Sequence, residues 1–222
     1  MSREEIYKKK NYFYIINGTW RQIVSQDHPE AVRRDWEATD GKKGTKYERE
    51  VTALFGKILE IAFIEGDYGT NINITLDPNE DGISPILSLS ASGREGEDFM
   101  KKLPNINLDK EVKLRPFNFD GENGNEVRGL EILQQDEADN FTVKITNFFR
   151  DNEKKLNLNG IPTPPKENDE MTKADWKIYF LQVNQFLIEY TRNYMIPKIE
   201  NPEKARLERY DEGKANLADI PF

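Results

Sequence analysis

The first two-thirds of the chain contain short apolar runs and stretches of alternating polar and apolar residues, a pattern that predicts β-strands. Two of these runs flank Asn17-Gly18 within residues 11–24. This dipeptide is typical of a two-residue hairpin turn, because both turn positions tolerate positive φ. The lone Gly56 indicates a bulge or a sharp bend inside a strand. Further strands are predicted at residues 47–64, 71–76, 83–90, 113–119 and 127–134, and residues 141–149 are a candidate last strand.

Polar residues dominate positions 27–46, where Gly41 and Gly44 predict a mobile loop rather than a helix. Residues 94–103 predict a short helix that ends at Pro104. This helix lies between the third and fourth core strands, which is the plan of an oligonucleotide-binding (OB) barrel. We therefore expect a mainly β protein with an α appendage: an OB-fold-like Greek-key barrel of five or six strands, with an N-terminal hairpin extension and a C-terminal helix.

The last third of the chain predicts a helical segment. Thr172 and Asp175 have the spacing of a capping box, and apolar residues from Trp176 to Tyr194 recur at three- and four-residue intervals. We expect Pro197 to end this helix and residues 202–210 to form a shorter one. We expect the apolar stripe formed by these residues to pack on the barrel of the same chain or on a second subunit. The predicted divisions are an OB-fold-like domain with its N-terminal extension at 1–150, a linker at 151–171, the helical segment at 172–213 and a flexible tail at 214–222.

Composition restricts the chemistry. The 222 residues include no cysteine and a single histidine, so disulfides, thiolate zinc sites and cysteine nucleophiles are excluded. Residues 77–82 begin like a calcium loop, but Ser88 stands where the bidentate glutamate is needed, so a hairpin turn is the better interpretation. Nothing in the sequence assembles a nucleophile, a base and an oxyanion hole. We therefore predict a protein that is not an enzyme and that holds no metal or cofactor.

The net charge of −8 argues at first against nucleic acid as a partner. The charge is unevenly placed, however, because residues 1–50 carry eleven basic and nine acidic side chains. The rest of the chain therefore holds all of the excess negative charge. Binding of an anion depends on the local field of a groove rather than on the total charge of the chain.

Basic and aromatic residues are interleaved at two places, as single-strand binders require for phosphates and bases. One is the stretch at 33–49, preceded by Trp20-Arg21 after the first hairpin. The other is the strand at 113–119, where alternate residues share a face; the alternative is that its phenylalanines belong to the core. The candidate nucleic-acid-binding residues are Trp20, Arg21, Arg33, Arg34, Trp36, Lys42, Lys43, Lys46, Tyr47, Arg49, Lys113, Arg115 and Phe117, and Phe119 would lie on the same face as the last three.

The sequence closes on Asp219-Ile220-Pro221-Phe222, behind the predicted barrel and a linker rich in Pro, Asn and Glu. This order resembles bacterial and bacteriophage single-stranded DNA-binding proteins, whose last residues dock into basic-rimmed apolar pockets on replication and repair partners. The resemblance implies that Phe222 is the anchor, that Pro221 and Ile220 line the pocket, and that Asp219 meets its rim. The acidic run of the bacterial tails is thinner here, and the helical segment is absent from the short bacterial forms; both differences favour a bacteriophage version.

We therefore expect a non-catalytic protein that coats single-stranded DNA in replication, recombination or repair and recruits partners through residues 219–222. A homo-oligomer formed through residues 172–196 is a further expectation. The alternatives are a scaffolding module whose β-domain binds protein, and an enzyme such as a nuclease. No apolar run is long enough to span a bilayer and no signal peptide is evident, so we predict a cytoplasmic location, in the host cell if the protein is viral.

Overall fold

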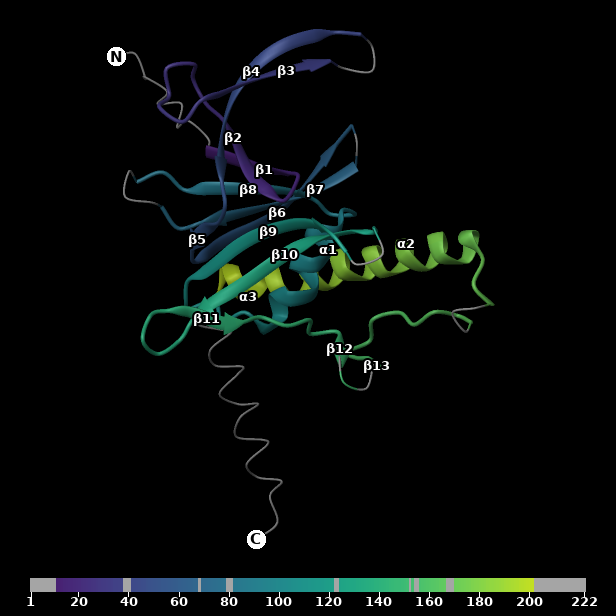
Figure 1. Cartoon of the computed structure of the whole chain (residues 1–222). Coiled ribbons are helices and arrows are strands. Elements are labelled where there is room, and N and C mark those ends of the chain that lie inside the picture. Colours follow the sequence, from purple (N-terminus) through teal and green to yellow (C-terminus); the bar gives the residue numbers. More distant parts are fainter. Residues whose placement is uncertain are drawn as a thin grey trace, which may run out of the picture.

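The computed structural model describes residues 11–37, 41–67, 69–78, 82–121, 124–151, 153, 156–166 and 170–201. Strands make up 45% of the protein, so the prediction of a mainly β fold is confirmed. Most of the described strands belong to two sheets, and the helices lie together at one side of them (Figure 1). Residues 202–210, predicted to form a short helix, and the tail at 214–222 lie outside the described residues.

The larger sheet has seven described strands, which all come from residues 11–90. Its strands, in order across the sheet, are β3 (Val32–Glu37), β4 (Lys43–Val51), β2 (Thr19–Ile23), β1 (Asn11–Ile16), β8 (Pro85–Ser90), β7 (Gly69–Leu76) and β6 (Ile58–Gly66). The smaller sheet has four described strands, in the order β11 (Phe141–Lys144), β10 (Glu126–Gln135), β9 (Val112–Asp120) and β5 (Leu54–Gly56). A separate two-stranded ladder joins β12 (Arg150–Asp151) to β13 (Leu156–Asn157).

The two sheets are joined where β5 passes into β6. Gly56 has φ +144°, a conformation that side-chain-bearing residues rarely adopt, and a Cβ there would lie 2.2 Å from Asp77 Oδ1. The same carboxylate accepts a hydrogen bond from the Lys57 backbone N–H at 2.7 Å. The bend predicted at Gly56 is therefore confirmed, and it sends one continuous segment from the smaller sheet into the larger one.

The predicted hairpin at Asn17-Gly18 is also confirmed. Both residues have positive φ, +51° and +75°, and β1 pairs with β2 in antiparallel register around them. A Cβ on Gly18 would lie 2.5 Å from the backbone nitrogen of Asn118, so the hairpin tip closely approaches β9. The Trp20 indole N–H donates to the Leu114 carbonyl at 2.9 Å and holds the hairpin against the same strand.

The hydrophobic core lies between the sheets. Ile72, Ile74 and Leu87 enter it from the larger sheet and Leu114 and Ile132 from the smaller one, and all five are fully buried. One end of the core is covered by α1 (Arg94–Lys102), which continues as a short 3-10 turn, η1 (Leu103–Asn105). The short helix predicted at residues 94–103 is therefore confirmed, and it lies between β8 and β9.

The predicted closed barrel is not observed, because the described sheets do not close on each other. Closure would require the free side of β8 to pair with the smaller sheet. That side instead pairs in parallel with β1, Phe13 opposite Leu87. The sheet therefore continues from β8 into the N-terminal hairpin and on to β4 and β3.

The predicted loop at 27–46 is wrong for much of its length. Residues 32–37 and 43–51 form β3 and β4, an antiparallel pair that projects from the body of the molecule (Figure 1). Pairs of opposite charge hold the strands together where apolar residues do not, as in the contact of Lys43 with Glu37 at 3.0 Å. Gly44 is needed for packing, because a Cβ there would lie 2.6 Å from the Trp36 ring. We call this pair of strands the β3–β4 arm.

The helical segment consists of α2 (Lys173–Tyr190), a π-helical turn η3 (Thr191–Met195) and α3 (Ile196–Glu200). The predicted capping box is present. Pro197 does not end the segment: it lies in the first turn of α3, where a missing N–H is tolerated. Val183 and Leu187 are buried, and Asn184 Nδ2 donates to the Ala91 carbonyl at 2.6 Å, so α2 packs on its own chain. None of the helices in the described ranges has the length and hydrophobicity that a membrane crossing requires.

The capping box gives a test of helix stability against pH. Hydrogen bonds from the Thr172 backbone and hydroxyl, with Lys166 nearby, lower the pKa of Asp175 to about 2. Because the folded pKa is below the unfolded one, the stabilisation is complete above about pH 5 and is lost as the pH falls toward 2. The difference in free energy of unfolding between the wild type and Asp175→Asn, measured by urea titration, is expected to shrink over this window. A difference independent of pH would contradict the capping role.

Candidate nucleic-acid interface

The base of the β3–β4 arm carries a network of charged side chains on one face. Glu48 accepts from Lys46 Nζ at 2.6 Å and from Arg21 at 3.2 Å. Glu50 accepts from Arg34 at 2.6 Å and from Arg21 at 3.1 Å. Three predicted binding residues are therefore brought together, but two carboxylates neutralise most of their charge.

Glu48 is the centre of this network. Only 1% of its side chain is exposed, and Tyr14 also donates a hydrogen bond to it. Burial raises the pKa of Glu48, but hydrogen bonds from Lys46 and Tyr14 outweigh burial and hold it below its usual range. The hydrogen bond to Glu48 raises the pKa of Lys46 in turn. The carboxylate thus stays ionised, and the cluster stabilises the arm more than it attracts an anion.

The other predicted arm residues point in different directions. Trp36 is 43% exposed and lies over Gly44 on the face of Arg34 and Lys46. Arg33 and Tyr47 lie opposite each other on the other face. Arg33 pairs with Asp35 at 3.2 Å, and Lys43 pairs with Glu37. Arg49 contacts Glu30 at 3.7 Å and donates to Gln22 at 2.5 Å. Lys42 is exposed just before β4.

Trp20 is not a binding residue. Its side chain has 0% exposure, and its indole N–H is satisfied by the Leu114 carbonyl. A buried ring has no free face on which a base could stack. The sequence prediction for Trp20 is therefore corrected: its place is in the core between the hairpin and β9.

The outer face of the smaller sheet brings aromatic and basic residues together. Lys113, Arg115, Phe117 and Phe119 alternate with buried Val112, Leu114 and Pro116, so the predicted shared face is confirmed. Phe119 is 56% exposed, which excludes the alternative that places it in the core. Three further residues of this face, from β5 and β11 on either side, were not predicted from the sequence: Phe55, Phe141 and Lys144. We call this set the phenylalanine face: Phe55, Lys113, Arg115, Phe117, Phe119, Glu131, Phe141 and Lys144.

Contacts within the phenylalanine face hold its rings in place while leaving surface exposed. Phe55 meets Phe141 edge-on, with ring centroids 5.2 Å apart, and is 47% exposed. Phe117 and Phe119 have centroids 5.9 Å apart. The Lys113 ammonium lies 5.3 Å from the centre of the Phe55 ring. Strand alternation is the sequence signal for Phe55, since it follows buried Leu54 by one position.

Charge distinguishes the phenylalanine face from the arm. Glu131 is the one carboxylate in the set, and it pairs with Arg115 and, at 3.8 Å, with Lys144. Three cations outnumber Glu131 and the adjacent Glu111, whose carboxylate accepts from Gln135 Nε2 at 3.3 Å, so a local excess of positive charge remains in a chain whose net charge is −8. The described residues contain no group of three His, Cys, Asp or Glu side chains placed to hold a metal ion.

No family model, curated protein or solved structure matches the chain. The chemistry of the phenylalanine face and of the arm therefore carries the functional argument.

Proposed function

We propose that the protein binds single-stranded DNA through the phenylalanine face. The observation that carries the proposal is the combination of four phenylalanine rings, two of them about half exposed, with three cations and one carboxylate. Stacking of a base on an aromatic ring is worth roughly 1–3 kcal/mol, and it tolerates any sequence because every base has a π-face. Trp36 and the arm offer a second, weaker contact region because their cations are paired.

The topology supports a relation to OB folds, which commonly bind single strands. A strongly bent first strand, β5 with β6, is shared by both sheets, and α1 lies between β8 and β9 as the helix of an OB fold does. We propose that the protein is an OB-like domain opened by insertion of the β1–β2 hairpin beside β8. On this proposal the N-terminal strands extend the sheet at the expense of barrel closure.

The remaining parts of the proposal concern the partners. We propose that the protein has no catalytic activity, coats single strands in replication, recombination or repair, and acts in the cytoplasm of its cell or host cell. Residues Asp219 to Phe222 would recruit other proteins by burying apolar side chains behind an acidic residue. These residues lie outside the described part of the chain, and their sequence alone supports this step.

Titration of oligo-dT against the full chain at low salt, followed by fluorescence anisotropy, tests the proposal. We expect affinity for oligo-dT at least about tenfold above that for a duplex of equal length, because paired bases cannot stack on the rings. We expect three phosphate contacts, from Lys113, Arg115 and Lys144. A plot of the logarithm of the binding constant against the logarithm of the salt concentration should then have a slope of about −2. Equal affinity for single strand and duplex would contradict the proposal.

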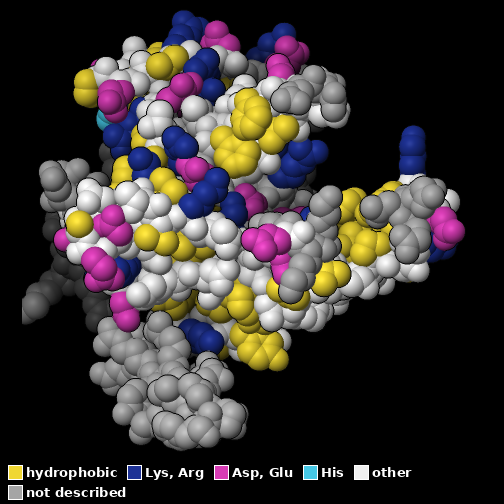
Figure 2. Space-filling view, turned by 60° about the horizontal axis from the view of Figure 1, so that its bottom comes forward, with side chains coloured by type: hydrophobic (Ala, Val, Ile, Leu, Met, Phe, Trp, Pro, Cys, Tyr) yellow, Lys and Arg dark blue, Asp and Glu magenta, His cyan; other side chains and the backbone are white. Residues whose placement is uncertain are grey.

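A second candidate function is a scaffolding module that binds proteins, favoured by the exposed apolar residues at the start of α2. Ile178, Phe180 and Leu181 are 56%, 52% and 61% exposed. Figure 2 shows hydrophobic side chains on the projecting part of the molecule where α2 begins. The proposed homo-oligomer through residues 172–196 would use the same surface. A complex that is unaffected by salt or oligonucleotide is the expected sign of this function.

A further inference from the structure

A cavity of about 590 Å³ lies between the first half of α2 and the segment that carries β12 and β13. Three contacts hold its wall in place: Tyr179 hydroxyl to the Pro162 carbonyl at 3.4 Å, Asn157 Nδ2 to the same carbonyl at 2.8 Å, and the edge of Phe149 against Phe186. Its volume is in the range of pockets that enclose small ligands or a few side chains.

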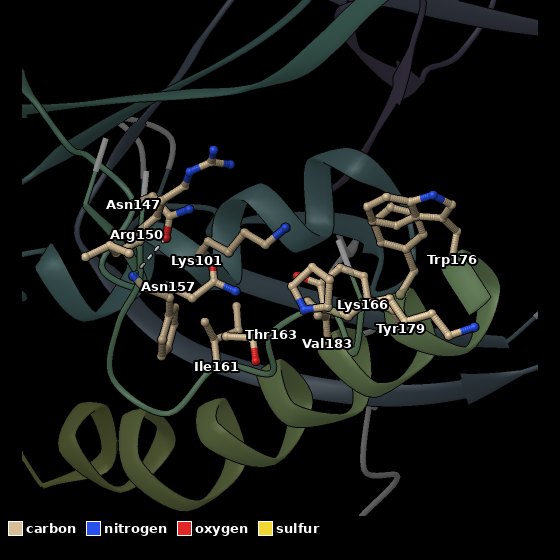
Figure 3. Close-up of a pocket in the computed structure, with 14 residues that line it drawn as sticks. Lys101, Asn147, Arg150, Asn157, Ile161, Thr163, Lys166, Trp176, Tyr179 and Val183 are labelled. Carbon is tan, nitrogen blue, oxygen red and sulfur yellow. Dashed lines mark hydrogen bonds between the residues drawn. The ribbon is translucent and has the colours of Figure 1, made fainter. Parts of the chain in front are cut away.

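The cavity combines an apolar lining with a cationic rim. Phe149 and Val183 are buried in its wall, and Phe180 and Trp176 stack with centroids 5.5 Å apart. In Figure 3, Arg150, Lys101 and Asn147 lie toward one end and Trp176, Tyr179 and Lys166 toward the other. Three lysine or arginine residues and no acidic residue are among its described lining residues.

The three cations are not equally available. Lys101 is paired with Glu97 at 3.0 Å, and Lys166 with Asp175 at 3.1 Å. Within the described ranges, Arg150 has no carboxylate at ion-pair distance, and its side chain is exposed. An apolar hollow that has such a guanidinium at its rim suits a peptide with an acidic residue close to apolar ones.

We propose that this cavity binds the chain's own residues 211–222. That segment contains Asp211, Glu212 and Asp219 with one lysine, and the apolar Leu217, Ile220 and Phe222, which is the composition the cavity suits. At 3.3 Å per residue, residues 202–222 can span about 69 Å. The helical segment separates Val183 from Asn201 by only about 27 Å at 1.5 Å per residue. The tether gives the segment a millimolar effective concentration, so modest affinity is enough for occupancy.

The proposed docking controls access to the segment. Residues held in the cavity are withheld from other proteins, a consequence that rests on the proposed recruiting role of Asp219 to Phe222. The cavity lies on the helical side of the core and the phenylalanine face on the outer side of the smaller sheet, so no DNA-binding residue is shared between them. A variant can therefore lose docking of the segment and keep DNA binding, or the reverse.

A labelled peptide of residues 211–222 tests the docking by fluorescence anisotropy against the full chain. Because the chain's own segment competes, Ile220→Ala/Phe222→Ala is expected to bind the peptide at least about fivefold more tightly than the wild type. In that background, Phe180→Ala and Arg150→Glu are expected to raise Kd at least about tenfold. The matched controls, Leu181→Ala on the adjacent exposed position and Arg192→Glu at an exposed position outside the cavity lining, should change Kd less than about twofold.

Three results would overturn the proposal. They are no saturable binding below about 1 mM, equal Kd values for cavity and control variants, or equal affinity of the wild type and Ile220→Ala/Phe222→Ala for the peptide. The last would show that the cavity binds this sequence as a free peptide but is not occupied by the segment within the chain. Oligo-dT binding of every variant is measured alongside; it should not change, so a failure of docking is distinguished from a failure of DNA binding.

Discussion

Alanine at both Phe55 and Phe119 is expected to weaken oligo-dT binding at least about thirtyfold, because each lost stack is worth roughly 1–3 kcal/mol. Both rings are about half exposed, so their removal leaves no cavity in the core. Anisotropy titration at low salt measures the loss in affinity, and urea unfolding checks that the variant remains as stable as the wild type within about 1 kcal/mol.

The matched control is Phe180→Ala/Tyr194→Ala, which removes two rings of similar exposure, 52% and 58%, from the helical segment. It should leave oligo-dT affinity unchanged within about twofold, since neither ring lies on the phenylalanine face. A comparable loss in both double variants would mean that aromatic residues in general, and not this face, hold the strand. Full affinity in Phe55→Ala/Phe119→Ala would move the site to Trp36 and the arm.

Features that depend on neighbouring residues could be predicted from the sequence. The hairpin at Asn17-Gly18 follows from the φ angles its turn demands. The shared face of Lys113 to Phe119 follows from strand alternation, and the cap at Thr172 from a three-residue spacing. Each of these requires no knowledge of a distant partner.

Features that depend on distant partners were predicted wrongly or not at all. Barrel closure fails because β8 pairs with β1, whose residues are about seventy positions away in the sequence. The arm has few apolar residues, so alternation of polar and apolar residues does not predict its strands. Ion pairs of Glu48 and Glu50 with arginines of the adjacent strands hold these strands in place. The same carboxylates weaken the electrostatic argument for DNA binding there, because they neutralise cations that appear free in the sequence.

Contacts between distant residues also explain why the arm and the phenylalanine face differ in charge. In the sequence, Arg34 and Arg115 belong to similar clusters of cations with aromatic residues. In the structure, Arg34 meets Glu50 in a network of three cations and two carboxylates, whereas Arg115 shares Glu131 with Lys144 beside exposed rings. The ratio of cations to carboxylates on one face is a property of strand register, and register links residues that are far apart in the chain.

Trp20 gives the largest expected effect on stability. Trp20→Ala would remove a fully buried ring and leave the Leu114 carbonyl without its donor, and it is expected to destabilise the protein by about 3–5 kcal/mol. The hairpin would lose its hold on β9, so the midpoint of urea unfolding should fall sharply. Far-ultraviolet circular dichroism measures this without reliance on tryptophan fluorescence.

Trp36→Ala is the matched control, because Trp36 is 43% exposed on the arm and its loss should cost no more than about 1 kcal/mol. Oligo-dT affinity measured where Trp20→Ala is still folded separates the two roles. If Trp20 stacked on bases, its loss would lower affinity and leave stability near that of the wild type. Burial between the hairpin and β9 predicts the reverse: a large loss of stability with affinity retained by the molecules that remain folded.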